Sequence, residues 1–331
     1  MKGKKIAAVV LTAIVVIAAG YVTINSMIFN PSLGSRLARL AIRLYMAPAF
    51  ASENAVAPVR SSINNMSKLA LLPAGTVVER ADVQGMSAEW VRGPGVGPMA
   101  GRALLFIHGG AFFSGSPATH RELAARISAA SGLPALVIDY RLAPEHRFPA
   151  ALDDCVAAYN FLLKQGLKPG KLAIGGDSAG GCLTMMTLLT LRDKHVTLPA
   201  AALLISPLTD AVNYDGESYR TRAEADPWFK PEDVGRHMTH FIGTAAVKPA
   251  ILSPLRCDLS GLPPILVQVG GDEILMSDST RLVERARKAG VDATVHVFDH
   301  MYHDFQLFGV IVPEARVAIA ELGAFLKKRV K

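Results

Sequence analysis

A single serine stands among small residues in the run GGDSAGG at 175–181. This residue, Ser178, completes the pattern G-x-S-x-G directly after an apolar stretch and at the start of a helical one. The small neighbours permit a strained backbone and a close approach of other segments, so the pattern at a strand-to-helix turn is typical of a nucleophilic serine. We predict acyl transfer with Ser178 as the nucleophile. The alternative is a tight turn that holds an inert serine.

A second glycine-containing run, HGGAFF at 108–113, also follows a short apolar stretch. Acyl transfer creates an oxyanion, which needs hydrogen-bond donors that are fixed in advance. The small residues Gly109, Gly110 and Ala111 offer backbone N–H groups and leave room for substrate. His108 is predicted to hold this loop and not to act as a base.

A nucleophilic serine needs a histidine base, and the base needs an acid that orients it. Asp272 and Glu273 follow the next-to-last apolar stretch of the chain, and His300 and His303 follow the last one. Asp272 comes first after the strand's carboxyl end, where parallel sheets place their functional groups, and is the preferred acid. Glu273 is its competitor. The residue types alone leave the choice between the two histidines open.

Apolar stretches of strand length alternate with helical stretches from residue 76 onward. The predicted strands lie at about 76–78, 88–91, 103–107, 135–138, 172–174, 201–205, 265–269 and 294–298, and the helices at about 120–130, 150–165, 179–192, 278–289 and 314–328. This alternation is typical of a mostly parallel α/β sheet with helices on its faces. It lapses at about 208–253, which we predict to be an inserted cap.

Composition narrows the class of protein further. The 331 residues are 50% hydrophobic and 19% charged, enough for a large core. The net charge of +7 comes partly from lysines and arginines near the two ends of the chain, and aromatic and basic residues do not interleave, so nucleic-acid binding is not expected. The three cysteines are widely spaced and no ligand cluster is visible, so neither a metal nor a cofactor is expected.

The N-terminus begins with three lysines and continues with the uncharged apolar run 6–22. Such a run is just long enough for a membrane span and slightly long for a signal-peptide core. We therefore expect residues 1–30 to form a single N-terminal membrane anchor, or else a signal segment that is cleaved to give a secreted or periplasmic protein. The lysines next to the run predict that the N-terminus stays in the cytoplasm and the catalytic domain lies outside.

The segment 31–74 is predicted to form an N-terminal cap region ahead of a catalytic domain at 75–331. Its first part alternates Arg36, Arg39 and Arg43 with leucines, which indicates a basic amphipathic helix. Such a helix suits either a membrane surface or packing against the domain, and the sequence does not choose between them.

The motifs together resemble the hormone-sensitive-lipase-like branch of the α/β-hydrolases. The resemblance covers most of 101–308 in the family's order: HGGAFFSG (108–115), DYRLAPEHRFPAALDD (139–154), GGDSAGG (175–181), SPL (253–255), GLPPILVQVGGDEIL (261–275) and MYHDFQLF (301–308).

The resemblance implies an α/β-hydrolase fold with a helical cap and a serine esterase for short to medium acyl chains. It places the catalytic residues at Ser178, Asp272 and His303. The oxyanion hole would comprise the N–H groups of Gly110, Ala111 and Ala179, with Gly109 giving room; the family's third glycine is replaced by Ala111.

Two other functions fit the same residues. One is a lactone hydrolase or a deacetylase of a single metabolite. The other is a non-catalytic receptor on the same fold, which is disfavoured because such receptors lack the histidine that His303 supplies here. The oligomeric state is not predicted.

Overall fold

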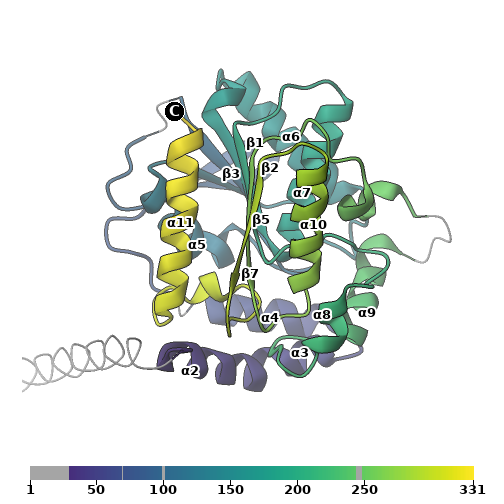
Figure 1. Ribbon diagram of the computed structural model, residues 1–331. Coiled ribbons are helices and arrows are strands. Elements are labelled where there is room, and N and C mark those ends of the chain that lie inside the picture. Colours follow the sequence, from purple (N-terminus) through teal and green to yellow (C-terminus); the bar gives the residue numbers. More distant parts are fainter. Residues whose placement is uncertain (1–29, 69, 99–100, 244–247) are drawn as a thin grey trace, which may run out of the picture.

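The computed structural model describes residues 30–68, 70–98, 101–243 and 248–331. Its centre is an eight-stranded sheet in the order β1-β2-β4-β3-β5-β6-β7-β8 (Figure 1). The pairs β1–β2 and β2–β4 are antiparallel, and all other neighbours are parallel. The strands are β1 (Val77–Val83), β2 (Met86–Arg92), β3 (Ala103–Ile107), β4 (Ala135–Ile138), β5 (Leu172–Asp177), β6 (Ala201–Ile205), β7 (Ile265–Gly270) and β8 (Ala293–Phe298).

The mostly parallel sheet predicted from the alternating pattern is confirmed. Every residue of β3, β4, β5, β6 and β7 is buried. A strand that helices cover on both faces has no solvent-exposed side, so its sequence is a continuous apolar run without alternating polar residues. The edge strand β8 is partly exposed, and only its first residue is fully buried.

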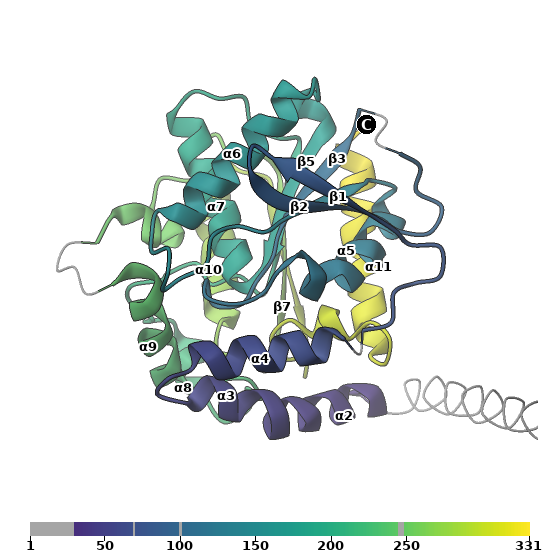
Figure 2. The ribbon, with the colours of Figure 1, turned by 180° about the vertical axis from the view of Figure 1, so that it is seen from behind.

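Helices cover both faces of the sheet (Figures 1 and 2). One face packs against α5 and α11, and the other against α6, α7 and α10. The bounds are α5 (Pro117–Ser131), α6 (Ala150–Lys164), α7 (Ser178–Asp193), α10 (Met276–Lys288) and α11 (Pro313–Arg329). Short 3₁₀ helices connect other elements: η2 (Pro169–Lys171), η3 (Ala250–Leu252), η4 (Pro254–Arg256) and η5 (Phe305–Phe308).

A layer of helices from two distant segments lies across one end of the sheet, at the bottom of Figure 2. The first segment forms α2 (Leu33–Ala41), the π-helix η1 (Ile42–Met46), α3 (Ala47–Ala51) and α4 (Val56–Ser67); the second forms α8 (Glu217–Thr221) and α9 (Pro231–Ile242). Phe50 of α3 joins them, since its ring lies 6.0 Å from that of Trp228 and 5.7 Å from that of Phe229. The two segments named as cap regions from the sequence thus pack together.

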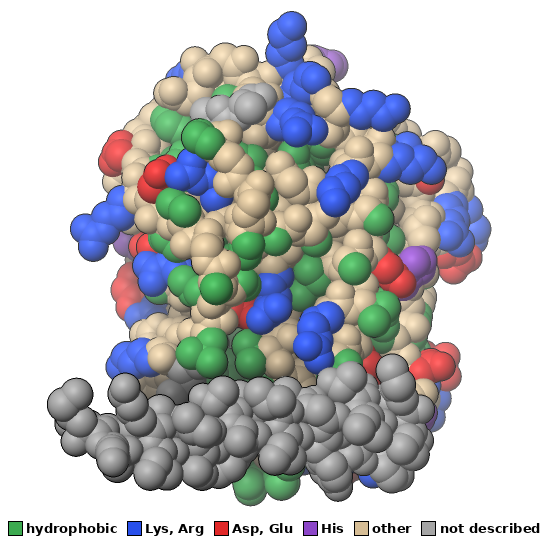
Figure 3. All heavy atoms as spheres, turned by 90° about the vertical axis from the view of Figure 1, so that its left-hand side faces the viewer, with side chains coloured by type: hydrophobic (Ala, Val, Ile, Leu, Met, Phe, Trp, Pro, Cys, Tyr) green, Lys and Arg blue, Asp and Glu red, His purple; other side chains and the backbone are tan. Residues whose placement is uncertain are grey.

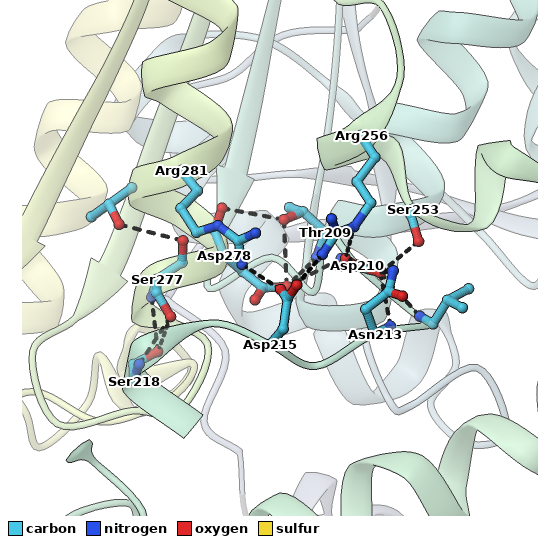
Figure 4. A network of polar contacts seen from close by, with 12 residues as sticks. Thr209, Asp210, Asn213, Asp215, Ser218, Ser253, Arg256, Ser277, Asp278 and Arg281 are labelled. Carbon is cyan, nitrogen blue, oxygen red and sulfur yellow. Dashed lines mark hydrogen bonds and ion pairs between the residues drawn. The ribbon is translucent and has the colours of Figure 1, made fainter. Parts of the chain in front are cut away.

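The chain leaving β6 for this layer is fixed to α10 by a buried carboxylate (Figure 4). Asp278 accepts hydrogen bonds from the backbone N–H groups of Thr209 (2.8 Å) and Asp210 (3.2 Å). Burial raises the pKa of Asp278 to about 7. Asp210 in turn binds Arg256 and Ser253. Because the network ties the start of the insertion to its end, it fixes where the second cap segment begins and returns.

No helix within the four described ranges is long and apolar enough to cross a bilayer. The predicted anchor at residues 1–30 lies almost wholly outside those ranges.

Candidate active site

Ser178 lies at the sharp turn between β5 and α7. Its φ is 52°, a left-handed conformation that L-residues with a side chain rarely adopt. The neighbouring glycines are required by space: a Cβ on Gly176 would lie 2.3 Å from the Ile107 carbonyl oxygen, and one on Gly180 only 2.0 Å from the same atom. The close approach of β3 to the turn therefore explains the small residues around the serine.

His303 reaches Ser178 from the loop that follows β8. Its Nε2 lies 2.9 Å from the Ser178 Oγ, and its ring stands edge-on to that of Phe229 at 5.0 Å. His303 is 3% exposed, whereas His300 is exposed and its carbonyl accepts a hydrogen bond from Arg39. Of the two histidines that the sequence offered, the structure brings His303 to the serine.

The acid beside His303 is Glu273 and not Asp272. The Glu273 Oε2 lies 2.7 Å from His303 Nδ1, and its Oε1 accepts hydrogen bonds from Ser206 Oγ (2.8 Å) and from the Gly270 N–H (2.5 Å). Asp272 instead forms an ion pair with Arg39 of α2 at 2.8 Å. The preference for Asp272 was therefore wrong. In the turn after β7, the first carboxylate points to the cap, and the second folds back under the histidine.

A further carboxylate, Asp304, was not anticipated. Its Oδ2 lies 3.1 Å from His303 Nε2, on the side of the ring that faces Ser178. Asp304 has a φ of 51°, which turns the chain back on itself, and its N–H donates to Ser206. Burial raises the pKa of Asp304. Burial alone would lower the pKa of His303, but the carboxylates of Asp304 and Glu273 act in the other direction and hold it well above the usual value.

The loop after β3 places Gly110 and Ala111 beside the serine. In the described part of the chain no acceptor lies on their N–H groups, and both line the same cavity as Ser178. Ala179, at the start of α7, has an N–H that no preceding turn can satisfy. Gly109 differs, since its N–H donates to Asp177 Oδ2 at 3.1 Å and a Cβ there would lie 2.2 Å from that oxygen. Gly109 therefore leaves room at the site, but Asp177 takes its N–H, so it is not one of the free donors that the run of small residues suggested.

His108 lies behind this loop. It is fully buried, its Nδ1 lies 2.8 Å from the Gly109 carbonyl oxygen, and its ring stacks on Tyr140 at 4.2 Å. Burial lowers its pKa to about 3, so the ring is neutral and Nδ1–H is the donor. This geometry fits the predicted role of holding the loop.

The loop is braced from a second side by an acid–histidine pair that sequence reasoning missed. Asp177, next to the serine, lies 3.1 Å from His120 Nε2 of α5. The burial of this pair would lower the pKa of His120, but Asp177 raises it overall. Arg60 of α4 completes the support by donating to the carbonyl oxygens of Phe113 and Ala143. The only signal in the sequence for this support was that Asp177 directly precedes Ser178 within GGDSAGG.

Two cavities meet at Ser178. The larger has a volume of about 300 Å³ and is lined by His303 and Asp304 together with mainly apolar side chains, among them Ile63, Met66, Leu71, Trp228, Leu307, Phe308, Val310 and Ile311. The smaller has a volume of about 30 Å³ and is lined by Ala111, Ala179, Leu208, Val234, Met238 and Leu275, among others. Phe50 and Phe229 line both cavities, as Ser178 and Ala111 do.

Among the described residues, no group of three or more His, Cys, Asp or Glu side chains is arranged to hold a metal ion. The strained serine at a strand-to-helix turn of a mostly parallel sheet, with a histidine and a carboxylate in line, defines the site of an α/β-hydrolase.

Comparisons with known proteins agree with this class. A family model described as alpha/beta hydrolase fold matches residues 104–307. An acetyl-hydrolase of Streptomyces hygroscopicus is 40% identical over 256 residues, 77% of this chain and 83% of that protein. An esterase of Acinetobacter venetianus is 34% identical over 92% of this chain and 96% of its own. The crystal structure of an esterase from the bacterial hormone-sensitive lipase family superposes with a TM-score of 0.83 at 39% identity, covering 88% of this chain and 98% of that one. The chain belongs to the hormone-sensitive-lipase-like α/β-hydrolases and is a carboxylic-ester hydrolase.

Proposed function

We propose that Ser178, His303 and Glu273 form the catalytic triad. The observation that supports it is the unbroken line from Ser178 Oγ to His303 Nε2 (2.9 Å) and from His303 Nδ1 to Glu273 Oε2 (2.7 Å). Ser178 attacks the ester carbonyl while His303 takes its proton. His303 then gives the proton to the leaving alcohol, and Glu273 holds the ring and stabilises its positive form. A water molecule then attacks the acyl-enzyme, with His303 again taking and returning the proton, and this releases the carboxylic acid and restores Ser178.

The N–H groups of Gly110, Ala111 and Ala179 form the oxyanion hole in this proposal. They lie on the two backbone segments that flank Ser178, and donors already in place stabilise the developing charge without reorganisation. Ala111 keeps its N–H despite replacing a glycine, and its φ of 54° is the left-handed value that a glycine would adopt freely.

The position of His303 assigns the two cavities. The leaving oxygen must lie near His303 Nε2 to receive its proton, and His303 lines the large cavity but not the small one. The alcohol part of the ester therefore occupies the large apolar cavity, and the acyl group occupies the small one. A site that holds one water has about 10–15 Å³ of comparable volume, so 30 Å³ suits an acetyl-sized group. Similarity to an acetyl-hydrolase supports the same choice.

Two isomeric esters test this assignment. Octyl acetate and ethyl octanoate have the same atoms and differ only in which side of the ester is long. We expect kcat/KM to be at least about tenfold higher for octyl acetate. The octanoyl group of ethyl octanoate exceeds the small cavity by several methylenes, and a single methylene that does not fit a pocket already costs about 1–3 kcal/mol. Val234→Ala, which widens the small cavity, should narrow the ratio; Val310→Ala, in the large cavity, is the matched control. Equal rates for both isomers in the wild type would refute the assignment.

We further propose that residues 1–30 anchor the enzyme in a membrane, with the catalytic domain outside the cytoplasm. Support comes from the apolar run 6–22 and the lysines before it. A cleaved signal segment is the alternative. Treating cells with protease after permeabilising only the outer membrane should digest the catalytic domain. Protection of the domain, while an exported control is cut, would refute the orientation, and a mature protein lacking residues 1–30 would show cleavage.

A further inference from the structure

Exposed apolar side chains are concentrated on one edge of the molecule. Among the described residues, eight of the eleven large hydrophobic side chains that are exposed belong to three neighbouring segments: Leu37, Leu40, Leu44 and Tyr45 of α2–η1, Leu71 and Leu72 after α4, and Val310 and Ile311 before α11. Figure 3 shows one face of the molecule, on which hydrophobic side chains are dispersed among basic and other ones. Scattered single residues of this kind need no explanation, but a gathering on three neighbouring segments does.

Helix α2 and its continuation η1 have two apolar faces. Ala38, Ile42 and Met46 are buried against the body of the protein, which accounts for the inner face. On the outer face, Leu37 and Leu40 are each 53% exposed and Leu44 is 60% exposed. Packing against the domain thus explains the apolar residues of the inner face but not the exposed leucines of the outer face.

The charged residues of α2–η1 itself are all basic. Arg36 and Arg43 are exposed beside the leucine row, and no Asp or Glu occurs from Leu33 to Met46. A helix with an apolar row and a basic flank is suited to the interface of an anionic bilayer, where the leucines enter the headgroup region and the arginines meet phosphates.

The mouth of the large cavity lies on the same edge. Leu71, Val310 and Ile311 line that cavity and are at the same time 69%, 43% and 44% exposed. Helix α2 contacts the loop that holds two of them: a Cβ on Gly34 would lie only 1.8 Å from the Ile311 carbonyl oxygen. The Ser32 N–H and hydroxyl also donate to Glu314, at 2.8 Å each. The start of α2 and the cavity mouth therefore cannot move apart without breaking these contacts.

The chain length before α2 limits how far this edge can be from an anchor. The apolar run ends at Val22, ten residues before Ser32. An extended chain spans at most about 3.5 Å per residue, so Ser32 lies within about 35 Å of the end of the run. An anchor formed by the run would keep the start of α2, and the cavity mouth beside it, near the bilayer surface.

We propose that the outer face of α2–η1 lies on a lipid surface and that the large cavity opens toward it, so that the substrate is drawn from the bilayer. This rests on the proposed function, which puts the alcohol in the large apolar cavity. The substrate class is then an ester of a lipid-soluble alcohol with an acyl group about the size of acetyl. A lipid surface is preferred over a protein partner because of the basic flank and the short connection to the apolar run.

The test compares two substrates with the full chain reconstituted in vesicles that contain anionic phospholipid. One is 4-nitrophenyl acetate, which reaches the site from water; the other is hexadecyl acetate dissolved in the bilayer. The variant L40E/L44E places two negative charges on the outer face. The control V77E/V317E introduces two glutamates at exposed valines of β1 and α11, which belong neither to the outer face of α2–η1 nor to the lining of the large cavity.

We expect L40E/L44E to hydrolyse 4-nitrophenyl acetate at the wild-type rate and to lose at least tenfold on hexadecyl acetate, while V77E/V317E keeps both activities. Unchanged hydrolysis of hexadecyl acetate by L40E/L44E would overturn the inference. Light scattering in detergent tests the alternative of a contact between two copies. A dimeric wild type and a monomeric L40E/L44E that keeps its activity on hexadecyl acetate would also overturn the inference, because the outer face would then be a dimer contact. A wild type inactive on 4-nitrophenyl acetate would instead refute the proposed function.

Discussion

The choice between two adjacent carboxylates gives the sharpest test of the site. We expect Glu273→Gln to lower kcat by about 10⁴-fold, the loss seen when the orienting acid of a serine protease becomes its amide. The structure gives the reason. The Glu273 Oε1 accepts from the Gly270 N–H and from Ser206, so the amide oxygen of a glutamine must take that position. The amide NH₂ then faces His303 Nδ1 and forces the proton onto Nε2, which can no longer accept the proton of Ser178.

Asp272→Asn is the matched control, because it makes the same chemical change one residue away. Asp272 contacts Arg39 in a partly exposed ion pair, with side chains 22% and 18% exposed. Such pairs contribute up to about 1 kcal/mol, which corresponds to about fivefold in rate even if all of it affected the transition state. Both variants are assayed with 4-nitrophenyl acetate at saturating substrate, and thermal unfolding checks that each is folded. A 10⁴-fold loss in Asp272→Asn, with Glu273→Gln active, would refute the reasoning.

Three other outcomes are expected. Ser178→Ala and His303→Ala should each lose at least about 10³-fold in kcat while remaining folded, and His300→Ala should stay near the wild type; the opposite result for the two histidines would exclude His303 as the base. Asp304→Asn should shift the acidic limb of the kcat/KM profile to lower pH by about 1–2 units, because Asp304 favours the protonated histidine, an interaction with a charged group is worth about 1.5–3 kcal/mol, and one pH unit is 1.36 kcal/mol. An unmoved limb would show that Asp304 does not act on the base. Chelators should leave the rate unchanged, and loss of activity that a divalent metal restores would contradict a metal-free mechanism.

Local sequence pattern determined the fold and most of the site. The buried strands could be predicted from their continuous apolar runs, because a strand that is covered on both faces has no solvent-exposed positions for polar residues. The position of Ser178 follows from its glycines, because a side chain at Gly176 or Gly180 would collide with the Ile107 carbonyl oxygen. Both signals are carried by a few neighbouring residues of the sequence, although the Ile107 carbonyl oxygen that requires the glycines belongs to β3.

Only the tertiary structure decided which groups meet. In the turn after β7, the Gly271 N–H donates to the carbonyl oxygen of Phe298 at the end of β8, and the Asp272 N–H donates to that of Met301 in the loop that holds His303, at 2.8 Å each. These bonds fix the backbone so that Asp272 points toward Arg39 and the longer Glu273 side chain turns back to His303. The partners are separated by 30 residues or far more, and one residue in a turn changes the direction of a side chain.

The same holds for the two cavities and for the outer face of α2. The sequence predicted an amphipathic helix but could not separate membrane contact from packing, because both need an apolar face. The structure shows that Ile42 is buried while Leu40 is half-exposed. The sequence determined which side chains are apolar; the packing of α2 against the rest of the protein decided which of them are left for a second surface, because burial depends on what lies opposite each residue in space.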